Sequence, residues 1–188
     1  MPFDLRTLTA NTEVVERLGW SCDLEFDSDA PAPDWFSVDG AEGITPIARD
    51  GAGGVFAQLT GSPRVLYVSS EGAAGFVAAD LEQFIALVAA CPYWHDLLTF
   101  SGNGNLDEMR RAAGVLEEAT LDDEELEETR TLLKAELGLA DLPDPVGVLY
   151  RAVSASDAIV RGPDGTPFGS LFNSMVIDEA RMRKLYGG

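Results

Sequence analysis

The order of apolar and polar positions between residues 44 and 90 predicts the centre of the fold. Apolar runs of strand length alternate there with glycine- and proline-containing turns. These connections are too short for parallel crossovers, so we expect the strands to pair antiparallel. The runs at 55–60 and 65–70 carry apolar residues on both faces, and we therefore expect helices to cover one face and a later part of the chain the other.

An amphipathic helix is predicted directly after these strands. Asp80 is a good N-cap residue and Gln83 follows three positions later, as in a capping box. Pro92 disfavours helical backbone at the residue before it and ends the helix. One stripe at positions i, i+3, i+4 and i+7 should face the sheet: Leu81, Phe84, Ile85 and Val88.

Periodicity and capping residues predict more elements outside this segment. Residues 146–153 fit a short helix or a strand, and the pattern does not separate the two. We expect a strand over 22–26, a hairpin over 158–172 with Asp164 and Gly165 in its turn, and helices over 9–18, 105–119, 122–137 and 176–187.

These elements predict an α+β fold. An antiparallel sheet of mixed connections packs against helices, and a helical and hairpin extension follows at the C-terminal end. A length of 188 residues suits one domain over 1–188, with a core over about 1–100 and the extension over about 105–188.

Charge is the most unusual global property. Thirteen basic residues against 32 acidic ones give a formal net charge of −19, which should repel nucleic acids and anionic membranes and attract a basic partner. A surface of this sign also favours solubility without any partner. The stretch from Glu117 to Glu128 holds eight carboxylates, but the rest of the chain would still carry −11, so the acidity is widespread.

The sequence carries no signal for a membrane or for secretion. No apolar run reaches the roughly 18–20 residues of a membrane span, and no basic segment precedes an apolar one at the N-terminus. Cys22 and Cys91 are too few for a disulfide framework, so we expect two reduced, buried thiols. A cytoplasmic location is the resulting expectation.

Candidate chemistry is sparse. His95 is the sole histidine, and one histidine with two distant cysteines does not make a zinc site. Asp50 opens a glycine-rich run that lacks the phosphate-binding patterns and joins two strands, which indicates a hairpin turn. Glu71 could pair with Asp50 or Asp80 for acid–base work, but the spacing gives no geometry. We therefore expect no catalytic residue, no cofactor and no metal ligand.

The central segment resembles the SUKH superfamily, which includes fungal cell-wall-synthesis regulators and many bacterial proteins. Members show a hairpin of the form I-x-P-[IF]-A-x-D-G-x-G, a strand pair, and a short strand leading into a [SD]-[FL]-x-x-F-[IL] helix. About a quarter of the chain matches, while the usual L-P-x-x-[YF] run near the N-terminus is missing. The matching positions are Ile44, Pro46, Ile47, Ala48, Asp50, Gly51, Gly53 or Gly54, Asp80, Leu81, Phe84 and Ile85.

This resemblance implies a non-enzymatic protein-binding domain, in bacteria an immunity protein that neutralises a toxin. The charge suggests a basic toxin that acts on nucleic acid. The alternatives are an intracellular regulatory or scaffold module without a toxin and an uncharacterised enzyme. The oligomeric state stays open. Partner-binding candidates are the aromatic residues that could be exposed and three carboxylates of the acidic run: Trp35, Phe36, Trp94, Glu124, Glu125 and Glu128.

Overall fold

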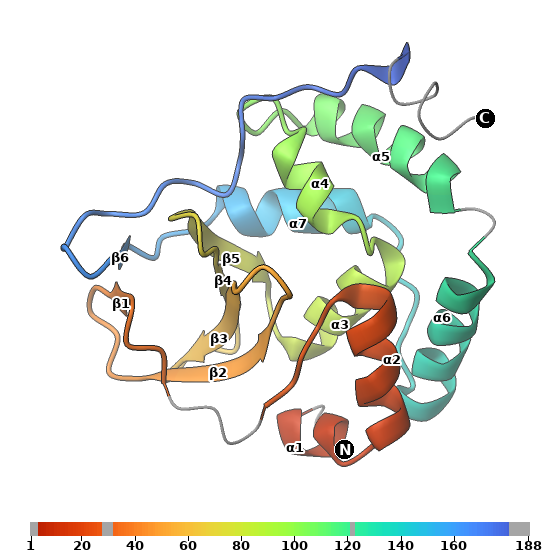
Figure 1. Ribbon diagram of the computed structural model, residues 1–188, viewed down its shortest axis with the longest axis horizontal. Coiled ribbons are helices and arrows are strands. Elements are labelled where there is room, and N and C mark those ends of the chain that lie inside the picture. Colours follow the sequence, from red (N-terminus) through yellow and green to blue (C-terminus); the bar gives the residue numbers. More distant parts are fainter. Residues whose placement is uncertain (1–3, 28–31, 121–122, 181–188) are drawn as a thin grey trace.

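The computed structural model describes residues 4–27, 32–120 and 123–180 (Figure 1). Its larger sheet has four antiparallel strands in the order β2-β3-β4-β5, and a smaller sheet pairs β1 with β6. The fold is α+β with the sheet packed against helices, as predicted. The strands are β1 (Ser37–Val38), β2 (Ile44–Arg49), β3 (Val55–Leu59), β4 (Val65–Val68), β5 (Ala74–Ala78) and β6 (Val160–Arg161).

The larger sheet is a meander because short turns join its neighbouring strands. Gly53 and Gly72 hold φ of +86° in two of these turns, a backbone region that glycine enters without steric cost. The described residues also form seven helices: α1 (Leu5–Thr9), α2 (Thr12–Cys22), α3 (Leu81–Ala90), α4 (Trp94–Thr99), α5 (Leu106–Thr120), α6 (Glu124–Leu137) and α7 (Pro145–Ser154).

Both faces of the larger sheet are buried, as the strand pattern predicts, although an earlier segment covers the second face together with the expected later one. Phe56 and Tyr67 point into the main core on the helical side. Leu66 points the other way, into a smaller core that Phe36 and Val160 complete. The helices accordingly lie on one side of the sheet, and the β1–β6 pair lies on the other (Figure 1).

Helix α3 confirms the predicted element in detail. The Asp80 carboxylate accepts from the Gln83 N–H at 2.8 Å, and the Gln83 side chain accepts from the Ala79 N–H at 2.8 Å. Its apolar stripe is buried, and Phe84 lies 4.8 Å from Phe56 between ring centroids. Burying one such side chain stabilises the fold by about 1.5–3 kcal/mol.

The part of the chain after residue 105 shares the main core. The segment left open between helix and strand is α7, which begins at Pro145 behind an Asp144 cap and packs against β5. The predicted hairpin is present, since Gly162 N–H donates to Thr166 O at 3.0 Å. The helix expected over 176–187 falls largely outside the described residues.

Two expectations near the N-terminus are wrong. The helix predicted over 9–18 ends too early, because α2 continues through Gly19 to Cys22 and ends at Asp23, which adopts φ of +53°. No strand forms over 22–26, because Cys22 still belongs to the helix and only Glu25 makes an isolated bridge, to Arg49. Gly19 lacks the left-handed φ of a C′ glycine, so it is tolerated inside the helix.

Candidate functional site

The first turns of α6 present the densest part of the acidic run. The Asp123 carboxylate caps the helix by accepting from the Leu126 N–H at 3.0 Å. Leu126 and Leu133 are buried, so the carboxylates between them point to solvent. Negative charge is favourable at a helix N-terminus, which lets the first turn carry Glu124 and Glu125 without destabilising the helix.

Helix α2 lies antiparallel to α6 and holds it in place. Ser21 and Thr129 share a hydrogen bond of 2.8 Å between their hydroxyls, and Thr129 is fully buried. At the other end of the pair, Asn11 Nδ2 donates to Glu136 Oε2 at 3.1 Å. The two helices therefore form a packed support for the side chains that they expose.

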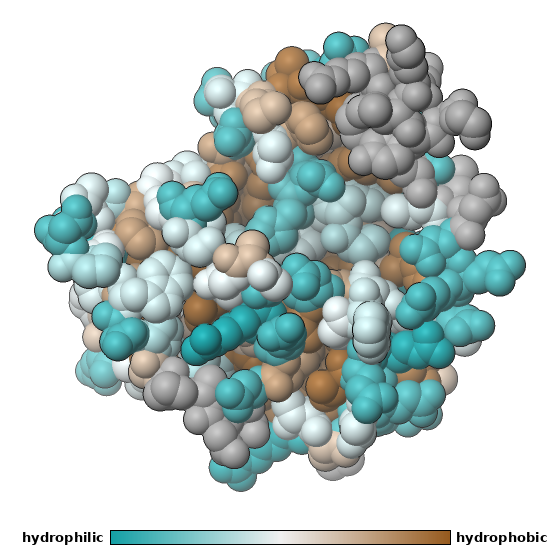
Figure 2. Space-filling model, viewed as in Figure 1, coloured by the Kyte–Doolittle hydropathy of each residue, from teal (hydrophilic) through white to brown (hydrophobic). Residues whose placement is uncertain are grey.

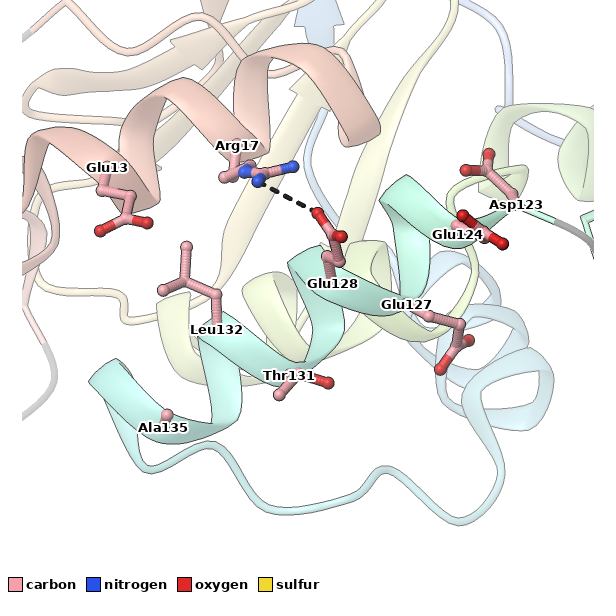
Figure 3. Close-up of a pocket in the computed structure, with 9 residues that line it drawn as sticks. All are labelled: Glu13, Arg17, Asp123, Glu124, Glu127, Glu128, Thr131, Leu132 and Ala135. Atoms are coloured by element: carbon pink, nitrogen blue, oxygen red, sulfur yellow. Dashed lines mark hydrogen bonds and ion pairs between the residues drawn. The ribbon is translucent and has the colours of Figure 1, made fainter.

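A groove of about 920 Å³ runs along these helices. Five of its nine lining residues are carboxylates and one is an arginine. Figure 3 shows Arg17 of α2 reaching toward Glu128 of α6, with Leu132 pointing from α6 toward α2. We call this the α2–α6 groove; it is lined by Glu13, Arg17, Asp123, Glu124, Glu127, Glu128, Thr131, Leu132 and Ala135.

Two of the five carboxylates in this groove form ion pairs, Glu128 with Arg17 and Glu127 with Arg130. Arg17 lies 3.3 Å from Glu128 and 4.0 Å from Glu125, so one cation is shared by two carboxylates. Glu13 and Glu124 form no ion pair with any residue that the structure describes. Figure 2 shows hydrophilic residues gathered over the region of α6. The groove thus offers unpaired negative charge on a fixed scaffold.

The three predicted carboxylates do come together here. Glu124 and Glu128 line the groove, and Glu125 stands at its rim near Arg17. Glu125 and Glu128 keep 63% and 66% of their side-chain surface exposed.

The predicted aromatic anchors lie elsewhere, and two of them are corrected by burial. Phe36 is 5% exposed beneath the sheet, and Trp94 is 2% exposed in the main core. Neither ring is accessible to a partner. Trp35 is half-buried and packs against Phe36 and Phe168, with ring centroids at 4.8 and 6.2 Å.

Sequence reasoning missed the exposed aromatic residue Trp20, which is 83% exposed on α2. The exposure of Trp20 follows from helix periodicity when α2 continues through Gly19. Leu18 faces the core, and a residue two positions further along a helix is rotated by about 200°, toward solvent. Ending the helix at residue 18 removed that argument.

The Asp50 hairpin is the second place where polar side chains converge. Asp50 is 5% exposed, and its Oδ1 accepts from the N–H groups of Ala52 at 3.1 Å and Gly54 at 2.7 Å. Its Oδ2 accepts from Tyr67 Oη at 2.6 Å and lies 3.3 Å from His95 Nε2. Burial alone would raise the pKa of Asp50, but His95, Tyr67 and Gly54 outweigh it and lower that pKa to about 2.

The contacts of Asp50 stabilise the hairpin. Both oxygens of Asp50 are already occupied, and burial followed by the hydrogen bond to Asp50 raises the pKa of Tyr67. The neighbouring Cys22 is buried, which raises its pKa to about 12 and keeps the thiol protonated. The adjoining cavity measures about 220 Å³, below the roughly 300–1,000 Å³ of ordinary ligand pockets.

Two of the carboxylates suggested as acid–base partners are engaged in structural hydrogen bonds. Asp50 contacts Tyr67 and His95, and Asp80 is engaged as the cap of α3. Within 4–27, 32–120 and 123–180, no group of three or more His, Cys, Asp or Glu residues is placed to hold a metal ion.

Comparisons with known proteins add no further assignment. The chain matches no protein-family model, no curated protein and no solved structure. In the described residues, no helix has the length and apolar character needed to cross a membrane.

Proposed function

We propose that this chain is a protein-binding domain of the immunity type, which binds and neutralises a basic cognate toxin. The observation that carries the proposal is the α2–α6 groove, where five carboxylates line two packed helices and Glu13 and Glu124 form no ion pair within the described residues. Fixed, unpaired charge of one sign steers an oppositely charged protein into contact and selects against acidic partners. The SUKH-like hairpin and helix over residues 44–90 support the immunity type of this function.

A regulatory or scaffold module is the second candidate, because the same groove could serve a basic housekeeping partner. The identity of the partner separates the two. An enzymatic function has no comparable support. Both carboxylate oxygens of Asp50 already accept hydrogen bonds within the hairpin and its neighbour strand, and the adjoining cavity is small.

The test is co-purification of this chain with the product of an adjacent toxin-like gene, followed by binding kinetics. We expect the variant Glu124→Gln/Glu125→Gln/Glu128→Gln to lose at least about tenfold in affinity, mainly through slower association at low salt. The control is Glu42→Gln/Glu71→Gln/Glu82→Gln, which changes the net charge equally at exposed positions outside the groove.

Equal losses in the two variants would show that only global charge matters and would contradict a role for the groove. The immunity type fails if no adjacent gene encodes a toxin-like protein and the purified chain binds only housekeeping proteins. In that case the regulatory candidate takes its place.

A further inference from the structure

Trp20 is the most exposed of the large apolar side chains in the described residues. It keeps 83% of its surface in water, whereas Trp94 keeps 2%. An exposed tryptophan leaves a large apolar surface hydrated, and tryptophan is enriched among the residues that dominate protein interfaces. The position of this ring therefore calls for an explanation beyond packing.

The helix geometry of α2 places Trp20 beside the α2–α6 groove. Trp20 follows Glu13 by seven positions and Arg17 by three, so it shares a helix face with both groove residues. Glu16, four positions before Trp20, is also exposed on this face. The next residue, Ser21, contacts Thr129 of α6, so the indole stands level with the acidic first turns of that helix.

This face combines one flat aromatic surface with the carboxylates of Glu13 and Glu16. An arginine or lysine stacked on an indole is attracted by the ring and, at an exposed site, gains about two- to fivefold in affinity. Neighbouring carboxylates would hold the other basic groups of the same partner. Acidic proteins and nucleic acids are repelled by the same charges, and a second copy of this chain would bring two acidic faces together.

We propose that Trp20 is the anchor of this face and that it receives an arginine or lysine side chain from a basic protein partner. This inference deepens the proposed function and rests on it for the biological partner. The recognition chemistry itself can be tested without that partner.

The first experiment uses blocked hexa-arginine and hexa-glutamate peptides with protein labelled by 5-fluorotryptophan. The three tryptophans should give separate ¹⁹F resonances because their surroundings differ, and Trp→Phe variants would assign them. We expect hexa-arginine to shift the Trp20 resonance in a saturable, salt-sensitive way and to leave that of Trp94 unchanged. We expect Trp20→Ala to lower the affinity for hexa-arginine by about two- to fivefold, although the net charge of the protein is unchanged.

A charge-matched pair of variants tests the flanking carboxylates. Glu13→Gln/Glu16→Gln should lower the affinity for hexa-arginine more than Glu42→Gln/Glu71→Gln does, although each pair removes two charges. Unchanged affinity in Trp20→Ala, an unmoved Trp20 resonance, or an equal shift with hexa-glutamate would overturn the inference. Because Trp20 is exposed, its replacement should leave the thermal midpoint nearly unchanged, so a lost signal reports binding rather than unfolding.

Two further outcomes separate this inference from the proposed function. If a toxin partner is found and binds Trp20→Ala as tightly as the parent chain, the role of Trp20 as an anchor is contradicted while the proposed function stands. If no toxin partner is found but the peptide results hold, the chemistry of the face stands without the immunity role. Sedimentation showing a dimer that Trp20→Ala dissociates would overturn the inference in favour of a second copy.

Discussion

The Asp50 hairpin and the α2–α6 groove use carboxylates in opposite ways. At the hairpin one buried carboxylate has four polar neighbours and every acceptor oxygen is engaged. In the groove five carboxylates face solvent, and only Glu127 and Glu128 form ion pairs within the described residues. Satisfied charge in a buried site fixes local structure, whereas unsatisfied charge on the surface stays available to another molecule. The same residue type therefore points to stability in one region and to binding in the other.

Removal of the Asp50 carboxylate should have the largest effect on stability. In Asp50→Ala the hydroxyl of Tyr67 and the N–H groups of Ala52 and Gly54 lose their acceptor inside the structure. We expect the free energy of unfolding to fall by about 3 kcal/mol, measured by urea denaturation.

The matched surface variant is Glu124→Ala, which removes a carboxylate from the groove. It should change the free energy of unfolding by less than about 0.5–1 kcal/mol, the size of a helix-dipole interaction. Similar losses in the two variants would break the contrast between a structural and an available carboxylate.

Local signals predicted the elements around both regions, and the reasons are visible in particular residues. Asp80 caps α3 and Gly138 ends α6 with φ of +65°, so these boundaries follow from short-range chemistry. The end of α2 was misjudged because its αL residue is Asp23, an uncommon choice, while Gly19 lies inside the helix. Trp20 was assigned no role for the same reason.

The contact between Asp50 and His95 could not be predicted in this way. These residues are 45 positions apart, and their approach depends on how α4 packs against the hairpin. The same holds for Arg17 and Glu128, which meet only because α2 and α6 pair. The acidic run is visible in the sequence, but the groove that its carboxylates line is a tertiary feature.

The next largest effect should appear in the pH dependence of the free energy of unfolding, to which the buried Asp50 carboxylate contributes. Its pKa of about 2 in the folded state lies below the ordinary value of 3.8, so folding favours the charged form. This stabilisation is complete above about pH 4 and is lost as the pH falls toward 2. We expect the difference in unfolding free energy between the parent chain and Asp50→Asn to shrink by about 2 kcal/mol between pH 5 and pH 2.

Taking the difference between two proteins removes the contribution of the other carboxylates, which titrate in both. A difference that stays constant over this range would mean that Asp50 does not gain from being charged. The charged form of Asp50 would then not stabilise the hairpin, and the proposed difference between a structural carboxylate there and available carboxylates in the groove would be contradicted.

Among the changes at the hairpin, Gly54→Ala should give the smallest effect, and it tests whether the hydrogen bonds of Asp50 depend on close packing. A Cβ at this position would lie 2.5 Å from Tyr67 Oη and 2.6 Å from Asp50 Oδ2, so it would push the two bonded atoms apart. We expect a loss of about 1–2 kcal/mol in thermal or urea unfolding. The control Gly114→Ala adds the same methyl group to α5, where no heavy atom beyond its chain neighbours and the nearby helix backbone lies within 4 Å, and it should stabilise the chain by about 0.5–1 kcal/mol. Opposite signs in the two variants would locate the constraint at the hairpin, whereas a neutral Gly54→Ala would show that the contacts of Asp50 can shift without cost.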